Sequence, residues 1–118
     1  MIFSPDLCEL ILAGKKTVTR RPVKYAPYAS TAGWLDCRYQ EGRSYAVQPG
    51  RGAKSVGRIL IRSATREPLG NVAHRLEARR EGFATVGDFV RRWEDLYGSH
   101  LFSWAQEIWR IEFELVAA

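Results

Sequence analysis

The segment from Gly14 to Arg21, with the sequence GKKTVTRR, holds four cations and two threonines within eight residues. Alternate residues of an extended strand share a face, so Thr19 and Arg21 would lie on the same side. A lysine that is crowded by cations or placed in an apolar pocket loses part of its preference for the charged form. Lys16 could then act as a base, or activate a nearby threonine hydroxyl. The same residues would also suit a solvated basic edge strand, where lysine discourages aggregation.

A glycine-rich segment, Gly50 to Ser55, has features of an anion site. Its glycines could let backbone N–H groups approach a phosphate, with Arg51 and Lys54 beside them. It lacks the Gly-Lys-Ser/Thr ending of a P-loop, and a strand follows it rather than a helix, so we expect no nucleoside triphosphate. Gln48 could read a base edge through its amide, which both donates and accepts. The alternative is an ordinary hairpin loop.

Arg58, Arg62 and Arg66 recur at every fourth position of a segment with strand alternation. On one strand face they would stand roughly 13 Å apart, at about 3.3 Å per residue. Such a row could follow a phosphate backbone, and it would then bind single-stranded RNA weakly and in a salt-dependent manner. It could equally be a solvated face.

The segment 25–42 is rich in aromatic residues and has no hydrophobic period. A long loop without secondary structure in a small domain is usually functional or mobile. Tyr28 and Trp34 could stack on bases there, as aromatic residues do in proteins that bind single strands. They could also fold back over the core as a lid.

The composition is that of a globular protein, and 118 residues suit one domain spanning 1–118. A net charge of +5 favours an anionic partner such as RNA, although a basic surface also serves solubility. Two cysteines and two histidines without metal-ligand spacing predict no disulfide framework, no metal site and no cofactor. No apolar stretch approaches the roughly 18 residues of a membrane span, and no signal peptide is visible. We therefore expect a cytoplasmic protein away from membranes.

The order of the elements favours an α+β fold. We expect helices over residues 5–13, 71–81 and 85–97, and strands over residues 15–21, 44–48, 56–66 and 108–116. Strands and helices do not alternate regularly, which argues against a doubly wound parallel sheet. A small mixed or antiparallel barrel-like sheet with helices at its side fits the order better. Its single core should contain the buried-stripe residues Trp93, Trp109, Ile111 and Phe113.

Three sequence blocks resemble one family. Residues 14–21 have the spacing G-x-K-T-x-T-x-R, residues 77–83 read EARREGF with Phe89 after them, and residues 109–113 read WRIEF. In these blocks, taken in this order, the chain resembles the ASCH domain family of the PUA-like superfamily. The resemblance implies a small mixed β-barrel with flanking helices. It also implies a cleft lined by the first block and by the block that contains Glu81.

The resemblance further implies the handling of RNA or nucleosides. One bacterial branch of the family hydrolyses the amide of N4-acetylcytidine, and its catalytic set corresponds to Lys16 as base, Thr19 as nucleophile or its partner, and Glu81 as the group that orients Lys16 or relays a proton. Arg21 would hold a phosphate or a developing oxyanion. The alternatives are a non-catalytic RNA-binding or regulatory module, and a ribonuclease. The segments 25–42 and 45–52 depart from the amidohydrolase branch, so we expect a reshaped cleft.

Overall fold

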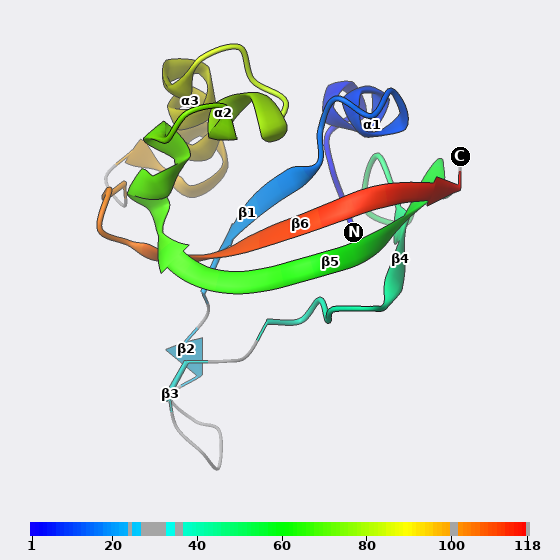
Figure 1. The fold of residues 1–118 in the computed structure, drawn as a ribbon, viewed down its shortest axis with the longest axis horizontal. Coiled ribbons are helices and arrows are strands. Elements are labelled where there is room, and N and C mark those ends of the chain that lie inside the picture. Colours follow the sequence, from blue (N-terminus) through cyan, green and yellow to red (C-terminus); the bar gives the residue numbers. More distant parts are fainter. Residues whose placement is uncertain (24, 27–32, 35–36, 100–101, 118) are drawn as a thin grey trace.

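The computed structural model describes residues 1–23, 25–26, 33–34, 37–99 and 102–117. Its centre is a curved four-stranded sheet with the strand order β1-β6-β5-β4, in which neighbouring strands are antiparallel (Figure 1). The strands are β1 (Val18–Pro22), β4 (Ser44–Val47), β5 (Gly57–Pro68) and β6 (Glu107–Ala117). The sheet and its helices confirm the expected α+β class.

The helices are α1 (Pro5–Leu12), the 3-10 helix η1 (Leu69–Ala73), α2 (Glu77–Arg80) and α3 (Val86–Tyr97). In Figure 1 the helices are drawn above the sheet, with α1 at the right and α2 and α3 at the left. Pro5 starts α1 at a position where its missing N–H costs nothing. Thr85 caps α3, because its side chain accepts a hydrogen bond from the backbone N–H of Asp88 at 3.1 Å. Among the described residues, no helix has the length and apolar character needed to span a membrane.

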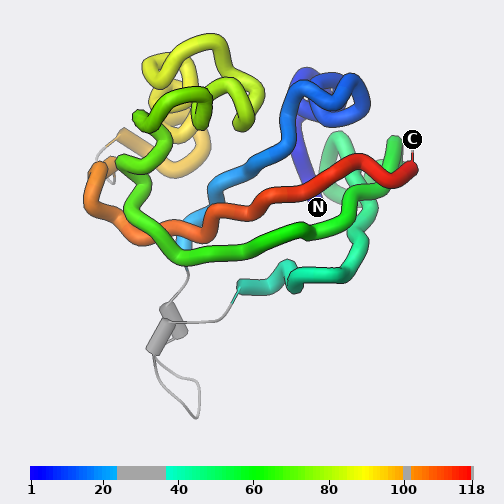
Figure 2. Tube along the Cα trace, viewed as in Figure 1, coloured from blue at the N-terminus to red at the C-terminus, as the bar shows by residue number. Residues whose placement is uncertain are grey.

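The two faces of β1 and β6 carry different chemistry. Thr19 lies opposite Ile111 and Arg21 opposite Trp109, whereas Arg20 lies opposite Arg110. Directly opposed residues point to the same side of a sheet, so Arg20 and Arg21 face opposite ways. We call the side of Thr19, Arg21 and Trp109 the barrel face, and the side of Arg20 and Arg110 the charged face. β6 lies between β1 and β5, as the chain path shows (Figure 2).

The buried apolar residues form two clusters rather than the single core expected from the sequence. The first includes Phe3, Ile11, Ile59, Ile111 and Phe113. The second comprises Leu69, Val72, Phe89, Trp93 and Ile108. The expectation was wrong because consecutive residues of a strand point to opposite faces, so Ile108 packs with Trp93 while Ile111 packs in the first cluster. Trp109 is only partly buried, against the first cluster.

The expected row of three arginines on one face of β5 is also wrong. The pairing of β5 with β6 shifts between Ile61 and Ser63, where Arg62 forms an irregularity. An extra residue in a strand reverses its alternation. Arg66 therefore lies opposite Trp109 on the barrel face, with its Cζ 5.7 Å from the centre of the Trp109 ring. It does not share the outward face of Arg58.

The secondary structure differs from expectation in three further segments: β1 begins at Val18 rather than at residue 15, and residues 71–81 and 25–42 also differ. The helix expected over 71–81 is divided into η1 and α2, because between them His74 has extended backbone and Leu76 adopts a left-handed conformation with φ of 69°. The segment 25–42, expected to lack secondary structure, contains the short paired strands β2 (Tyr25–Ala26) and β3 (Gly33–Trp34). Pairing between so few residues leaves no hydrophobic period to detect.

Candidate functional site

Lys16, which follows α1, and Glu81, at the C-terminal end of α2, form a buried ion pair. The Nζ of Lys16 donates to the carbonyl oxygens of Val18 and Glu81, both at 2.7 Å, and to Oε1 of Glu81 at 3.1 Å. The two side chains retain only 1% and 3% of their accessible surface. A protonated lysine has three N–H donors, and three oxygens receive them here. The geometry therefore matches the charged ammonium form of Lys16.

Arg20 connects this pair to further carboxylates on the charged face. Its Nη1 donates to Oε2 of Glu81 at 3.0 Å, and its Nη2 donates to Glu77 at 2.6 Å and Glu67 at 3.1 Å. Arg110 donates from Nε to Glu77, also at 2.6 Å. We call these residues the ion cluster: Lys16, Arg20, Glu67, Glu77, Glu81 and Arg110. With three cations and three carboxylates the cluster is balanced in charge, which makes its burial tolerable.

Burial and pairing act against each other on the pKa values within the ion cluster. Burial lowers the pKa of Lys16, because the charged form loses solvation, while Glu81 opposes that change. For Glu77, burial acts to raise the pKa, but hydrogen bonds from Arg110 and Arg20 outweigh it and lower the pKa to about 2. The carboxylate of Glu77 is therefore held ionised across the physiological range.

Thr19 lies apart from this pair. It is buried on the barrel face, opposite Ile111, with 5% of its surface exposed. The three N–H donors of Lys16 are directed to other oxygens, so none is left for the Thr19 hydroxyl. The structure thus brings Lys16 and Glu81 together, and within the described residues Thr19 is not one of their hydrogen-bond partners.

A cavity of about 670 Å³ opens beside the barrel face. We call it the cleft, and its larger polar and aromatic side chains are those of Arg21, Arg38, Tyr39, Gln48, Tyr97 and Trp109. It combines aromatic rings with amide and guanidinium groups, a mixture typical of small-molecule sites. Burial raises the pKa of the Tyr97 hydroxyl, so this group is protonated at neutral pH.

Two of the polar side chains in the cleft are held in place by backbone oxygens. Arg21 donates from Nη2 to the carbonyl of Ile2 at 2.9 Å, and its Cζ lies 5.1 Å from the centre of the Phe3 ring. Gln48 donates from Nε2 to the carbonyl of Ala53 at 2.9 Å. These contacts limit the conformations of both side chains before any ligand enters, which reduces the entropy that binding would cost.

The same arrangement of elements occurs in solved structures of other proteins. An ASCH domain from Lactobacillus crispatus JV V101 aligns with a TM-score of 0.70 and 18% identity, over 95% of this chain and 71% of that one. The chain has the fold of an ASCH domain. A mutant of ZmASCH from Zymomonas mobilis aligns with a TM-score of 0.61 and 14% identity, over 97% of this chain and 66% of that one.

A protein from Enterococcus faecalis V583 aligns similarly with this ASCH fold, with a TM-score of 0.63 and 18% identity, over 94% of this chain and 70% of that one. In comparisons by sequence, no family model and no curated protein matches the chain. At identities this low the likeness establishes the fold and leaves the activity open.

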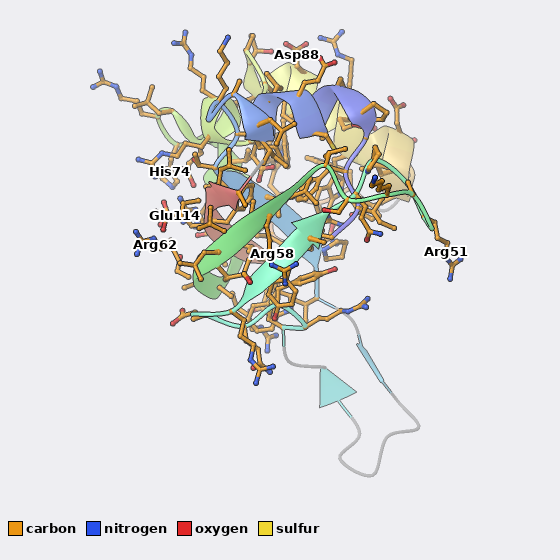
Figure 3. All side chains as sticks on the ribbon, turned by 90° about the vertical axis from the view of Figure 1, so that its right-hand side faces the viewer. Arg51, Arg58, Arg62, His74, Asp88 and Glu114 are labelled. Atoms are coloured by element: carbon orange, nitrogen blue, oxygen red, sulfur yellow. The ribbon has the colours of Figure 1, made fainter. Side chains whose placement is uncertain are left out.

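The remaining basic residues proposed from the sequence do not converge on the cleft of this ASCH fold. Arg51 and Lys54 are exposed in the loop between β4 and β5. Arg58 is exposed and donates from Nε to Oγ of Ser44 at 3.0 Å. Figure 3 shows Arg51 and Arg62 at opposite sides of the view, with Arg58 between them. These side chains are spread over the surface, so they do not form one compact anion site.

Two aromatic residues proposed from the sequence cannot be placed in the cleft. Tyr28 lies outside the described residues, and Trp34 belongs to β3 with its side chain outside the description. Sequence reasoning missed Arg38, Tyr39 and Tyr97 as cleft residues. The first two lie in a segment without periodicity, and Tyr97 continues the apolar stripe of α3, so local patterns give no signal for them. Within the described part of the chain, no three His, Cys, Asp or Glu side chains gather in a way that could hold a metal ion.

Proposed function

We propose that this ASCH-fold chain binds a ligand containing a nucleobase, in RNA or in a modified nucleoside, in the cleft. The observation that carries the proposal is the composition of the cleft: Tyr39, Tyr97 and Trp109 share about 670 Å³ with Arg21 and Gln48. Aromatic side chains stack on bases, and an amide can pair with a base edge. The volume lies within the range of about 300–1,000 Å³ that small-molecule sites occupy.

The ion cluster supports this function as a scaffold. Glu81 and Glu77, from the α2 segment, are tied by Arg20 and Arg110 to β1 and β6, the strands that also carry Arg21 and Trp109. A buried network of ion pairs fixes the relative positions of the elements that carry it, although Nε of Arg20 has no hydrogen-bond partner among the described residues. In this role the cluster positions the cleft and need not touch the ligand.

Isothermal titration calorimetry of the chain with cytidine, N4-acetylcytidine and a short single-stranded RNA tests the proposal. Trp109→Ala should weaken binding about fivefold or more, since stacking on one base contributes about 1–3 kcal/mol. Trp104→Ala is the matched control, because Trp104 is 48% exposed and does not line the cleft. Absence of binding to all three ligands, or equal losses in the two variants, would contradict the proposal.

Hydrolysis of an N4-acylated cytidine is the second candidate, and it requires the acyl group to reach Thr19, because Lys16, Thr19 and Glu81 do not line the cleft. It is favoured by the burial of Lys16, which lowers the pKa of this lysine, although Glu81 opposes the change. Neutral Lys16 would accept the Thr19 hydroxyl proton, and the Thr19 oxygen would attack the acyl carbon. The C–N bond would break as Lys16 returns the proton to the departing amine, and water would then hydrolyse the acyl-threonine ester. Lys16 must give up one of its three hydrogen bonds for this to happen.

The two functions are separated by the products. Incubation with N4-acetylcytidine, followed by chromatography, should show cytidine and acetate if the chain is a hydrolase, and Thr19→Val should abolish their release. Binding of N4-acetylcytidine without release of cytidine and acetate would reject the hydrolase and agree with a binding module. Shortened RNA fragments in a parallel incubation would instead indicate the ribonuclease, and a circular dichroism spectrum checks that the variant is folded.

A further inference from the structure

We infer that the cleft selects a ligand that carries a phosphate group, so that a nucleotide binds more tightly than the neutral nucleoside. This inference rests on the proposed function, because it concerns the same cleft. It adds the charge of the ligand, which the stacking residues leave undetermined.

The charges that line the cleft have one sign. Arg21 and Arg38 line it, and among the described residues no aspartate or glutamate side chain does. Neither arginine forms an ion pair within the described part of the chain, whereas Arg62 and Arg66 on β5 pair with Glu114 and Glu107. A cavity with low-dielectric walls and charges of one sign concentrates ions of the opposite sign. An anionic group on the ligand would therefore be attracted.

The position of Arg21 places this charge next to the stacking surface. Arg21 lies directly opposite Trp109 across β1 and β6. Side chains opposed in this way lie about 4.5–5.5 Å apart at their Cβ atoms. A base stacked against Trp109 would thus have its sugar and phosphate within reach of the Arg21 guanidinium.

Arg21 also retains donors for a ligand. A guanidinium has five N–H donors in a planar fork, and the described contacts use one of them, on the carbonyl of Ile2. The fork suits two phosphate oxygens at once. Arg38, with its Cζ 5.7 Å from the centre of the Tyr39 ring, is an exposed second cation at the same cavity.

The arrangement of groups therefore suits a nucleotide. Aromatic side chains receive the base, and two arginines without carboxylate partners among the described residues receive the phosphate. The phosphate could belong to a free nucleotide or to an RNA backbone, and the chemistry of recognition is the same for both.

The experiment is isothermal titration calorimetry with cytidine, cytidine 5′-monophosphate, cytidine 3′-monophosphate, inorganic phosphate and a short single-stranded RNA. We expect at least one nucleotide to bind about tenfold or more tightly than cytidine, because hydrogen bonds to a charged group are the stronger kind. The preference should shrink about fivefold in Arg21→Gln or Arg38→Gln. Arg91→Gln is the control, because Arg91 is exposed on α3 and does not line the cleft.

The outcomes are distinct. Equal binding of cytidine and both monophosphates overturns the inference and leaves the proposed function standing. If no base-containing ligand binds, both the inference and the proposed function are overturned. Both are also overturned if inorganic phosphate binds as tightly as the nucleotides, because the base then contributes nothing to binding. A preference that survives in both Arg21→Gln and Arg38→Gln also overturns the inference.

Arg38→Gln does not disturb the contact of Arg21 with Ile2, so it serves even if Arg21→Gln fails to fold. RNA that binds more tightly than both monophosphates supports the inference with the backbone as the phosphate source, and a monophosphate that binds as tightly as RNA supports it with a free nucleotide.

Discussion

Replacing Glu77 with glutamine should remove a pH-dependent part of the stability of this chain. Glu77 accepts hydrogen bonds from Arg20 and Arg110, each at 2.6 Å, and its side chain is 13% exposed. Its pKa is about 2, against an ordinary value of 4.5. Because the pKa is lower in the folded state, the ionised carboxylate stabilises the fold above about pH 4.5, and that contribution is lost as the pH falls toward 2.

The size of the effect follows from the two pKa values. A difference between 4.5 and about 2 corresponds to about 3 kcal/mol, at about 1.4 kcal/mol for each tenfold change in proton affinity. At pH 7 Glu77→Gln should therefore lower the free energy of unfolding by about 2–3 kcal/mol. At pH 3 the wild-type carboxylate has lost more than half of its contribution, so the difference should shrink to about 1 kcal/mol.

Urea unfolding followed by tryptophan fluorescence at pH 7, 5 and 3 measures these differences. Glu114→Gln is the matched control, because Glu114 pairs with Arg62 on the surface, where both side chains are exposed and such pairs contribute little. The reasoning would be refuted if the difference in free energy of unfolding between wild type and Glu77→Gln were as large at pH 3 as at pH 7. If the wild type is unfolded at pH 3, an NMR titration of the Glu77 carboxyl carbon above that pH decides the matter, since a midpoint near 4.5 would refute it too.

Two further predictions concern local backbone geometry. Gly82→Ala should lower the free energy of unfolding by about 1–2 kcal/mol, because Gly82 has φ of 98° and an added Cβ would lie 3.0 Å from Cδ1 of Leu10. Thermal unfolding measures this loss, with Gly50→Ala as the control because Gly50 has open space around it. Equal melting temperatures of the two variants would contradict the prediction. Thr85→Ala should lower the free energy of unfolding by about 1 kcal/mol through loss of the α3 cap, and Thr85→Ser should retain most of the stability. If serine destabilises the chain as much as alanine, the cap does not act through its hydroxyl oxygen.

Much of the architecture was predictable from local patterns. The alternation in residues 108–116 and the helical stripe from Val86 to Tyr97 correspond to β6 and α3 within a residue or so. These periods survive folding because each strand or helix must turn one side toward apolar surroundings. The ASCH resemblance, which rested on the spacing of three short blocks, predicted the fold that the structural comparison shows. It also named Lys16 and Glu81, which the structure brings into contact.

What the sequence by itself determined was thus the periodicity of the elements and the presence of the motif residues. Only the tertiary structure decided how these residues meet. Lys16 and Glu81 are separated by 65 positions, and no local period specifies that the end of α2 packs over the start of β1. The irregularity at Arg62 places Arg66 opposite Trp109. The cleft is lined by Arg38, Tyr39 and Tyr97, which come from segments with no common sequence pattern. A cavity is the space that several elements leave between them, so its lining depends on how they pack, which local sequence patterns do not encode.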